Sequence, residues 1–392
     1  MPKNKIVDIK SLYYITHIEN LPSIFEHGIL CHSLLEEKQL VSTAIYDNNI
    51  VNNRKEKLTP DGKKLWDFAN FYFQPRNPML YRVVNEKSKD DIVVLGIRPQ
   101  ILTKSGIYLT DGNAANTDTN IYTYEQGLKS LSEIWEVVSS EWWNSVDGSK
   151  RKIMAECLIP DLVSPNMIHT IYVSNNGLIN KTKELLPKQQ IAIIAEPKMF
   201  FYPVLRRITK NLFLVEGDMF FSKAQTLTVS VNTVGVMGKG LASRAKYQFP
   251  DVYVKYQEVC RSKELTMGNP YLYKREASFD YELADEPSTL NTINAIKWFL
   301  LFPTKHHWRK NSDLQGIEKG LNWIVENYEK EKIKSLALPA LGCGLGNLEW
   351  KDVGPMMCRY LSKLSVSVLI YLPREIDIPN EQRTAEFLLK NT

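Results

Sequence analysis

The chain has 392 residues, of which 44% are hydrophobic and 24% charged, a composition typical of a soluble globular protein with about two domains. The formal net charge of +5 permits an anionic partner without requiring one. The longest apolar runs, at residues 298–302 and 366–372, are too short to span a bilayer, and no signal-peptide stretch follows the basic N-terminus. We therefore expect a cytoplasmic protein with no membrane partner.

The first half predicts strands, helices and long polar loops. Residues 12–15 are typical of a strand, and an amphipathic helix is expected over residues 21–27, ended by Gly28. A long polar stretch follows, with a short helical piece near residues 47–57, and long ordered loops tend to cover sites. Arg76 lies between Pro75 and Pro78, which favours a stiff, non-helical turn.

Further along the first half, the pattern favours strands over residues 91–98, 152–160, 167–174 and 191–201, another strand from residue 107, and a helix over residues 124–143. Glu156 is expected in the middle of its strand. The pattern of residues along the chain changes near residues 203–210. We place the domain boundary there, with one domain over residues 1–208 and a second over residues 209–392.

The second half alternates strands and helices, which indicates an α/β layered domain with a largely parallel sheet. A polar segment is expected between the helix after Gly240 and residue 287. Strands are expected near residues 213–220, 227–233, 335–341 and 366–372, and helices after Gly240 and over residues 290–300, 313–330 and 350–364.

Two glycine-rich loops follow apolar runs of this half. One contains Gly235, Gly238 and Gly240, and the other spans residues 342–346. Glycine lets the backbone approach a ligand closely, and a helix that begins near Leu241 would direct its N–H groups at an anion. The two loops suggest a diphosphate held from both sides, and the alternative is that they are tight turns between packed elements.

The five cysteines predict no metal site. They show no CxxC pair and no histidine at metal-ligand spacing, so a reducing compartment is the natural interpretation. Cys343, in the second glycine loop, is expected to be a small packing residue rather than a catalyst. The cysteines are Cys31, Cys157, Cys260, Cys343 and Cys358.

The motifs GDMF at 217–220, NTVGVMGKGLA at 232–242 and LPALGCGLGNLEW at 338–350 resemble those of the macrodomain family, over roughly residues 211–375. The resemblance implies an α/β fold with a mixed sheet sandwiched by helices that binds ADP-ribose. It is especially similar to the antitoxin family DarG, which removes ADP-ribose from DNA. The simpler alternatives for the residues are that Asp218 caps a turn and that Lys246 is a solvated lysine. The alternative for the whole domain is that it only binds ADP-ribose or inhibits its partner domain.

The DarG resemblance also implies roles for individual residues. Lys246 matches the lysine that attacks the ADP-ribosyl linkage, which requires a lowered pKa. Asp218 would accept from the adenine amino group, and Asn232 would orient the distal ribose. The diphosphate would lie against the backbone of Gly238, Gly240, Gly342, Gly344 and Leu345.

Segments of the first half resemble the toxin family DarT: LYYITHIENLPSIFEHGIL at 12–30, NNIVNNRK at 48–55, FYFQPRNPMLY at 71–81, LTD at 109–111 and MAECLIP at 154–160. The resemblance implies an α+β ADP-ribosyltransferase fold that consumes NAD and modifies single-stranded DNA. Glu156 matches the catalytic glutamate and Arg54 the essential arginine. The alternatives are an outward-facing strand residue for Glu156 and an exposed surface arginine for Arg54.

The same resemblance implies an NAD site around the first strand. Tyr14 stands where many relatives carry a histidine, and a tyrosine can still stack and hydrogen-bond. Asn20 could equally cap a helix, and Arg76 could equally lock its turn. The residues implied in NAD binding are Tyr14, Thr16, His17, Asn20 and Arg76.

The two resemblances together predict a toxin–antitoxin fusion that writes and erases ADP-ribose on single-stranded DNA. Pairing with a macrodomain favours thymidine as the modified base, with another base, RNA or protein as the alternatives. An unpaired base is required because the target nitrogen is engaged in a duplex. Several aromatic residues could stack on bases, although most are expected in the core: Tyr46, Trp66, Phe71, Tyr72, Trp142 and Trp143.

The chain ends soon after the macrodomain-like region. We therefore expect hydrolytic reversal, rather than blocking by a further C-terminal region, to restrain the transferase. Whether the two domains also contact each other is left open.

Overall fold

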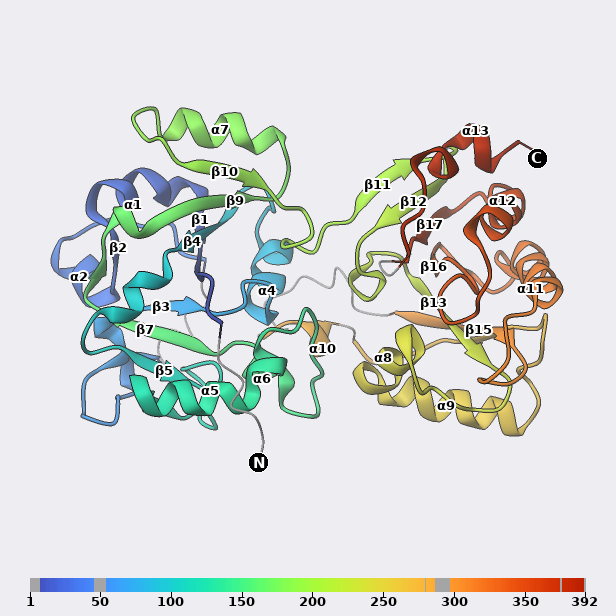
Figure 1. The fold of residues 1–392 in the computed structure, drawn as a ribbon, viewed down its shortest axis with the longest axis horizontal. Helices are drawn as coiled ribbons and strands as arrows, with labels where there is room; N and C mark the ends of the chain where they lie inside the picture. The colour runs from blue at the N-terminus through green and yellow to red at the C-terminus, as the bar shows by residue number, and fades with distance from the viewer. Residues whose placement is uncertain (1–7, 46–53, 279, 286–296, 374–375, 391–392) are drawn as a thin grey trace. The chain divides into compact units, whose positions relative to one another are not determined.

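The structure is a computed structural model that describes residues 8–45, 54–278, 280–285, 297–373 and 376–390. Contacts within the chain divide it into two compact units (Figure 1). The first unit runs to Phe200 and also takes in the short segment that begins at Asp280, whereas the second unit begins at Phe201 and resumes after that segment. The boundary expected between residues 208 and 209 falls between the first two strands of the second unit.

The first unit is built on an eight-stranded sheet with the order β10-β9-β4-β1-β3-β7-β5-β6. Strand β1 pairs antiparallel with both β3 and β4, so the first strand of the chain lies inside the sheet. Strands β9 and β10 are parallel to each other. The strands are β1 (Leu12–His17), β3 (Phe68–Tyr72), β4 (Ile92–Ile97), β5 (Tyr108–Thr110), β6 (Ile121–Thr123), β7 (Glu156–Pro160), β9 (Ile168–Val173) and β10 (Ala192–Ala195).

Helices and a small second sheet surround this core. Helix α1 ends as expected, because Gly28 adopts a φ of 90°, a conformation that glycine reaches without a steric cost. The small sheet pairs β2 (Ile29–Leu30) with β8 (Leu162–Val163). The helices are α1 (Leu21–His27), α2 (His32–Glu37), α4 (Pro78–Glu86), α5 (Tyr124–Val138), α6 (Ser149–Lys152), α7 (Gly177–Leu185) and α10 (Asp280–Leu283).

The second unit contains a seven-stranded sheet with the order β11-β12-β17-β16-β13-β15-β14. Its five inner strands are parallel, and the two edge strands pair antiparallel, which confirms a mixed and largely parallel sheet. The strands are β11 (Val204–Arg207), β12 (Leu212–Glu216), β13 (Thr226–Asn232), β14 (Tyr271–Tyr273), β15 (Trp298–Lys305), β16 (Ser335–Pro339) and β17 (Ser367–Tyr371).

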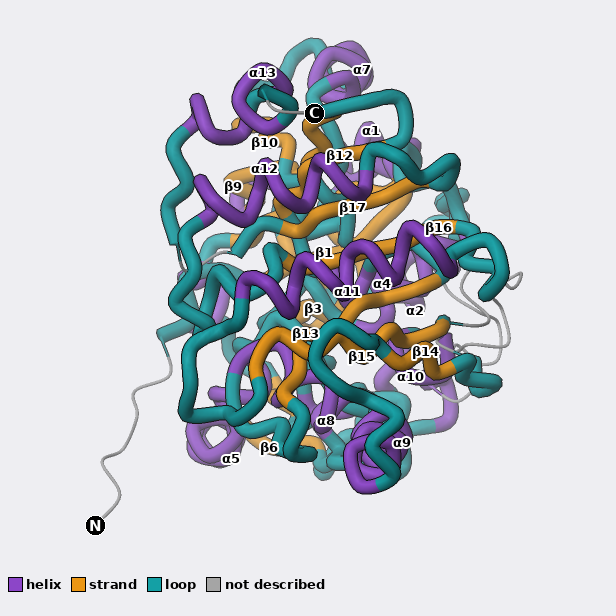
Figure 2. The backbone as a smooth tube through the Cα atoms, turned by 90° about the vertical axis from the view of Figure 1, so that its right-hand side faces the viewer, coloured by secondary structure: helices purple, strands orange, loops and turns teal. Residues whose placement is uncertain are grey.

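Helices cover both faces of this second sheet. Phe302 of β15 packs against α11 so closely that a Cβ on Gly320 would lie 2.5 Å from its ring. Phe299 of the same strand packs against Phe249, with ring centroids 5.1 Å apart, on the opposite face. Figure 2 shows α11 and α12 in front of the strands of this sheet, with α8 and α9 near the β13–β15 side. These helices are α8 (Gly240–Gln248), α9 (Pro250–Arg261), α11 (Leu314–Asn327), α12 (Trp350–Leu361) and the short α13 (Ala385–Leu388).

Three expectations about individual elements were wrong. Residues 298–300, expected to end a helix, begin strand β15, and most of the remainder of that expected helix lies outside the described residues. The segment expected to be polar contains α9 and β14. Glu156 is the first residue of β7 rather than a middle one.

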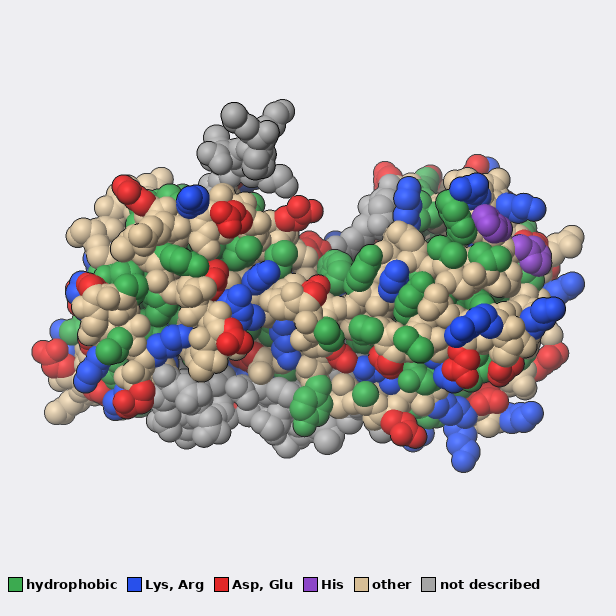
Figure 3. Space-filling view, turned by 90° about the horizontal axis from the view of Figure 1, so that it is seen from below, with side chains coloured by type: hydrophobic (Ala, Val, Ile, Leu, Met, Phe, Trp, Pro, Cys, Tyr) green, Lys and Arg blue, Asp and Glu red, His purple; other side chains and the backbone are tan. Residues whose placement is uncertain are grey.

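The surface carries both signs of charge. Figure 3 shows Lys and Arg side chains, in blue, interspersed with Asp and Glu side chains, in red. No helix among the described residues has the length and apolar character needed to cross a membrane.

Candidate functional site

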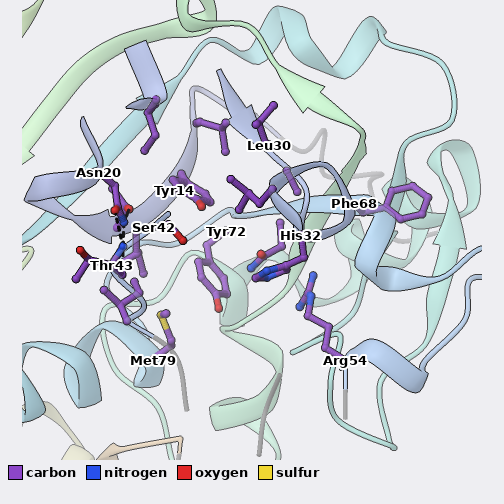
Figure 4. A pocket seen from close by; sticks show the side chains of 18 of the residues that line it. Tyr14, Asn20, Leu30, His32, Ser42, Thr43, Arg54, Phe68, Tyr72 and Met79 are labelled. Atoms are coloured by element: carbon purple, nitrogen blue, oxygen red, sulfur yellow. Dashed lines mark hydrogen bonds between the residues drawn. The ribbon is translucent and has the colours of Figure 1, made fainter. Parts of the chain in front are cut away.

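A pocket opens in the first unit beside β1, β3 and α2 (Figure 4). It brings together Tyr14, Thr16, Asn20 and Arg54, four of the residues expected in the transferase site. His17, Arg76 and Glu156 are not among the residues that line it. The described lining is Tyr14, Ile15, Thr16, Asn20, Ser23, Ile24, Gly28, Ile29, Leu30, His32, Leu35, Ser42, Thr43, Ile45, Arg54, Phe68, Ala69, Asn70, Tyr72, Met79, Arg82, Asn113 and Asp285.

Asn20 fixes one wall of this pocket. Its Nδ2 donates to the carbonyl oxygen of Thr43 at 2.9 Å, and its Oδ1 accepts from the Thr43 backbone N–H at 2.8 Å. The same Nδ2 also donates to the Thr16 hydroxyl at 3.1 Å. Asn20 occupies the N-cap position of α1, yet its side chain makes no cap hydrogen bond. It therefore ties the segment around Thr43 to β1 instead of capping the helix.

Glu156 and Arg54 form a buried ion pair next to the pocket. An oxygen of Glu156, Oε2, accepts from Nη1 of Arg54 at 3.0 Å, and Oε1 accepts from the Ala114 backbone N–H at 2.9 Å. The side chain of Glu156 is fully buried and that of Arg54 is 8% exposed. Neither residue therefore has the exposed position that the alternatives required.

Arg54 presents further donors to the pocket that it lines. Its Nε and Nη2 atoms are buried and have no hydrogen-bond partner among the described residues. Buried guanidinium donors normally find acceptors, and a phosphate or carbonyl oxygen of a ligand would supply them. The arginine can thus hold Glu156 with one nitrogen and a ligand with the others.

Tyr72 and His32 complete the polar side of the pocket. Tyr72 was named from the sequence only among aromatic residues that could stack on bases, and His32 was missed. Tyr72 pairs directly with Glu156 across β3 and β7, and burial together with Glu156 and Asp285 raises the pKa of its hydroxyl well above the usual value. His32 stacks on Trp66 with ring centroids 4.1 Å apart. Burial and the nearby Arg54 lower the pKa of His32 to about 4, so its imidazole is neutral at pH 7. No spacing pattern marks His32 in the sequence.

Arg76 and His17 make contacts elsewhere. The buried guanidinium of Arg76 donates from Nε to the Lys198 carbonyl oxygen at 3.1 Å and from Nη1 to the Glu141 carbonyl oxygen. This geometry fits the turn-locking alternative. His17 precedes a short 3-10 turn, where its Nδ1 accepts from the Glu19 backbone N–H at 3.2 Å.

Asp285, which lies far along the sequence, also lines this pocket. Its Oδ1 accepts from Nε of Arg82 at 2.8 Å, and Glu86 accepts from Nη1 of Arg82 at 2.7 Å. Arg82 is fully buried. Burial opposes its charge, but Asp285 and Glu86 outweigh that effect and raise the pKa of the guanidinium. The first unit therefore depends on a residue from the second half of the sequence.

We expect Asp285→Ala to destabilise the first unit by about 3 kcal/mol, because it removes one of the two carboxylates that compensate the buried charge of Arg82. Urea unfolding followed by tryptophan fluorescence measures the effect. Glu36→Ala is the matched control, since Glu36 and Lys55 form an exposed pair at 3.8 Å that should contribute well under about 1 kcal/mol. Equal, small effects of the two substitutions would contradict the prediction.

The two glycine loops of the second unit meet at one edge of its sheet. They follow β13 and β16, which are parallel neighbours, so both loops lie at the carboxyl ends of the strands. A Cβ on Gly240 would lie 3.2 Å from Cδ1 of Leu345, and Gly240 has a φ of 60°. Gly344 has open space around it, and a Cβ on Gly238 would have Val236 as its nearest neighbour at 4.0 Å. The backbone of both loops can therefore be approached closely by a ligand.

Asn232 and Gly342 shape these loops. The Asn232 side chain accepts from the Val234 N–H at 3.0 Å and donates to the Val236 carbonyl oxygen at 2.6 Å, and the Tyr256 hydroxyl donates to it at 2.9 Å. Gly342 has a φ of 74°, which a residue with a Cβ would reach only with strain.

Asp218 and Arg244 form an ion pair on this unit. Oδ2 of Asp218 accepts from Nη1 of Arg244 at 2.8 Å, and its Oδ1 caps the Phe220 N–H at 3.1 Å. The guanidinium of Arg244 stacks 4.7 Å above the Phe220 ring. Asp218 is thus a cap residue, as one alternative held, and its expected contact with adenine stays a prediction.

Lys246 lies on α8 and is half-buried. Its Nζ lies 4.5 Å from the ring centroid of Tyr253 and 5.5 Å from that of Tyr247. Such cation–π contacts hold the ammonium group in place rather than leaving it in bulk water. Cys343 is buried, and burial with nearby Asp352 raises its pKa to about 12, which suits a packing residue. Within the described residues, no cluster of His, Cys, Asp and Glu could hold a metal ion.

Comparisons with known proteins agree with this two-unit arrangement. The family described as "ssDNA thymidine ADP-ribosyltransferase, DarT" matches residues 13–201, and the Macro domain family matches residues 289–357. A "DNA ADP-ribosyl transferase-DNA ADP-ribosyl glycohydrolase fusion protein" of Thermosipho africanus is 55% identical over 97% of this chain and 98% of its own. A "DNA ADP-ribosyl glycohydrolase" of Thermus aquaticus is 33% identical over 42% of each chain. The solved structure "Thermosipho africanus DarTG in complex with ADP-ribose" has a TM-score of 0.91 and 53% identity, and the match covers 97% of this chain and 100% of that one.

Proposed function

We propose that this chain both transfers ADP-ribose to DNA and removes it again. The chain belongs to the family of DNA ADP-ribosyl transferase–DNA ADP-ribosyl glycohydrolase fusion proteins. The first unit transfers ADP-ribose from NAD to a base of single-stranded DNA, with thymidine as the favoured base. The second unit hydrolyses the bond that the first unit makes. The observation that carries the proposal is the buried Arg54–Glu156 pair beside a pocket whose wall presents further donors of Arg54.

In the transferase reaction, the bond between nicotinamide and ribose breaks through a state in which the ribose gains positive charge. The Glu156 carboxylate stabilises that charge and helps to take the proton from the attacking base nitrogen. The unpartnered nitrogens of Arg54 bind a phosphate or carbonyl oxygen of NAD. Tyr14, Thr16 and Asn20 shape the pocket around the rest of the dinucleotide.

In the hydrolase reaction, the facing glycine loops bind the diphosphate through backbone N–H groups. The side-chain nitrogen of Lys246 attacks the anomeric carbon of the distal ribose, and the bond to the DNA base breaks as the base nitrogen takes up a proton. Water then releases ADP-ribose from the lysine. Asn232 orients this ribose, and Asp218 contacts the adenine.

We assign transfer to residues 1–208 and hydrolysis to residues 209–392, with residues 280–285 serving the fold of the first unit. The pair forms a toxin and its antitoxin in one polypeptide, with single-stranded DNA as the shared partner. We place it in the cytoplasm, and its free cysteines fit that reducing compartment.

The test is to incubate the full chain with NAD and short oligonucleotides that each contain one kind of base, and to follow the products by mass spectrometry. We expect one ADP-ribose to be added to thymidine in single-stranded DNA and then to disappear as the second unit removes it. A duplex of the same sequence is the control, because its bases are paired. Mass gained only by RNA or by protein would overturn the assignment.

A further inference from the structure

A strongly basic loop, residues 305–310, begins at the last residue of strand β15 in the second unit. Its sequence, KHHWRK, contains three cationic side chains, and no acidic residue occurs until Asp313. His306, Trp308, Arg309 and Lys310 are exposed.

Hydrogen bonds fix this basic loop to both glycine loops. The hydroxyl and N–H of Thr233 donate to the His306 carbonyl oxygen at 3.0 and 3.3 Å. The ammonium group of Lys305 donates to the Leu345 carbonyl oxygen at 2.9 Å. The basic loop therefore lies next to the site proposed to hold ADP-ribose, and its position is set by the loops that form this site.

Trp308 is an exposed aromatic residue that contacts both of its neighbours in the sequence. Its ring lies nearly parallel to that of His307, with centroids 5.4 Å apart and planes inclined by 27°. The guanidinium carbon of Arg309 lies 4.5 Å from the Trp308 centroid. Trp308 nevertheless remains 48% exposed, although burying a tryptophan would be favourable.

Exposed apolar side chains continue this surface onto the glycine loops. Val234 and Val236 on the first loop are 48% and 39% exposed, and Leu345 on the second is 64% exposed. Apolar residues gathered around a ligand-accessible backbone indicate an interaction surface.

We propose that the basic loop holds the single-stranded DNA that carries the ADP-ribosyl group, with Trp308 stacking on a neighbouring base and Arg309 and Lys310 contacting phosphates. The proposal rests on the hydrolase activity proposed above, because such a substrate must leave its strand outside the ADP-ribose site. An exposed aromatic ring among cations is the combination that binds single strands with little dependence on sequence. The basic loop thus gives the hydrolase a second binding site for its substrate, which contacts the DNA strand while the glycine loops bind the ADP-ribose.

The test compares the KM of the hydrolase for two substrates. NAD is left out, so that the transferase has no ADP-ribose to transfer. One substrate is an oligonucleotide that carries a single ADP-ribosylated base, and the other is the ADP-ribosyl nucleoside obtained from it by nuclease digestion. We expect Trp308→Ala to raise KM for the oligonucleotide about tenfold and to leave the nucleoside unchanged, with Trp308→Phe restoring most of the affinity. Arg309→Ala should lower the slope of log KM against log salt by about 0.7, because the variant neutralises one phosphate fewer.

The matched control is Arg359→Ala, which removes an exposed arginine of α12 that pairs with Glu318 at 2.6 Å. It should leave KM for both substrates unchanged. If Trp308→Ala impairs both substrates equally, or neither, or impairs only an RNA of the same sequence, the DNA-holding role is wrong. If the unaltered protein cleaves neither substrate, the hydrolase activity itself fails, which is a separate outcome.

Discussion

Replacing Glu156 by glutamine is expected to lower the rate of ADP-ribose transfer to single-stranded DNA by about 10³-fold or more. The amide keeps the size of the side chain, but it supplies neither the negative charge that stabilises the ribose nor a base for the acceptor proton. The Ala114 N–H can still donate to the remaining carbonyl oxygen, as it does to Oε1 at 2.9 Å. Transfer is measured as radiolabelled ADP-ribose incorporated into a single-stranded oligonucleotide.

Because Glu156 is half of a buried ion pair, the substitution also costs stability, and a control must separate the two effects. Asp111→Asn disrupts another carboxylate–arginine pair of the same unit, in which Nη1 of Arg151 lies 2.8 Å from Oδ1 of Asp111. Neither member of that pair is among the residues that line the pocket. We expect this control to retain transfer within a few-fold. Comparable losses in both variants would show that Glu156 acts only through stability.

Local signals made much of the fold predictable from the sequence. The helix over residues 21–27 and its glycine stop were correct, because a single residue with positive φ ends the helix whatever surrounds it. Strand β15 was missed because a short apolar run such as residues 298–302 suits a buried strand and a buried helix equally. Its partners β13 and β14, on either side in the sheet, decide between them.

The candidate sites, like the fold, were predictable from the sequence only in part. Arg54 and Glu156 were proposed from a family resemblance, but only the fold brings together two residues that lie 102 positions apart. The Asp285–Arg82 pair, across 203 positions, carried no signal at all, since the sequence shows neither that Arg82 is fully buried nor where its partner comes from. Long-range burial of charge is therefore what the sequence could not reveal.

Replacing Lys246 by alanine is expected to slow removal of ADP-ribose from DNA by about 10³-fold or more, while transfer continues at its normal rate. The loss follows because the variant has no amine to attack the anomeric carbon. Modified DNA, which should be transient with the unaltered protein, should then accumulate until NAD is used up. The time course of ADP-ribosylated oligonucleotide, followed by mass spectrometry, measures both rates.

Lys239 offers a matched control, because it is an exposed lysine that directly precedes α8. With Lys239→Ala, the ADP-ribosylated DNA should still form and then disappear, as with the unaltered protein. This control shows whether the effect of Lys246→Ala comes from loss of the attacking amine or only from loss of a positive charge near the glycine loops. In cells, Lys246→Ala should arrest growth, and adding Glu156→Gln to the same chain should restore it, because no lesion is then made. If modified DNA disappears equally fast with and without Lys246, the second unit does not use this lysine to remove the modification. If the unaltered protein does not remove the modification either, a macrodomain that only binds ADP-ribose or inhibits the transferase is the better explanation.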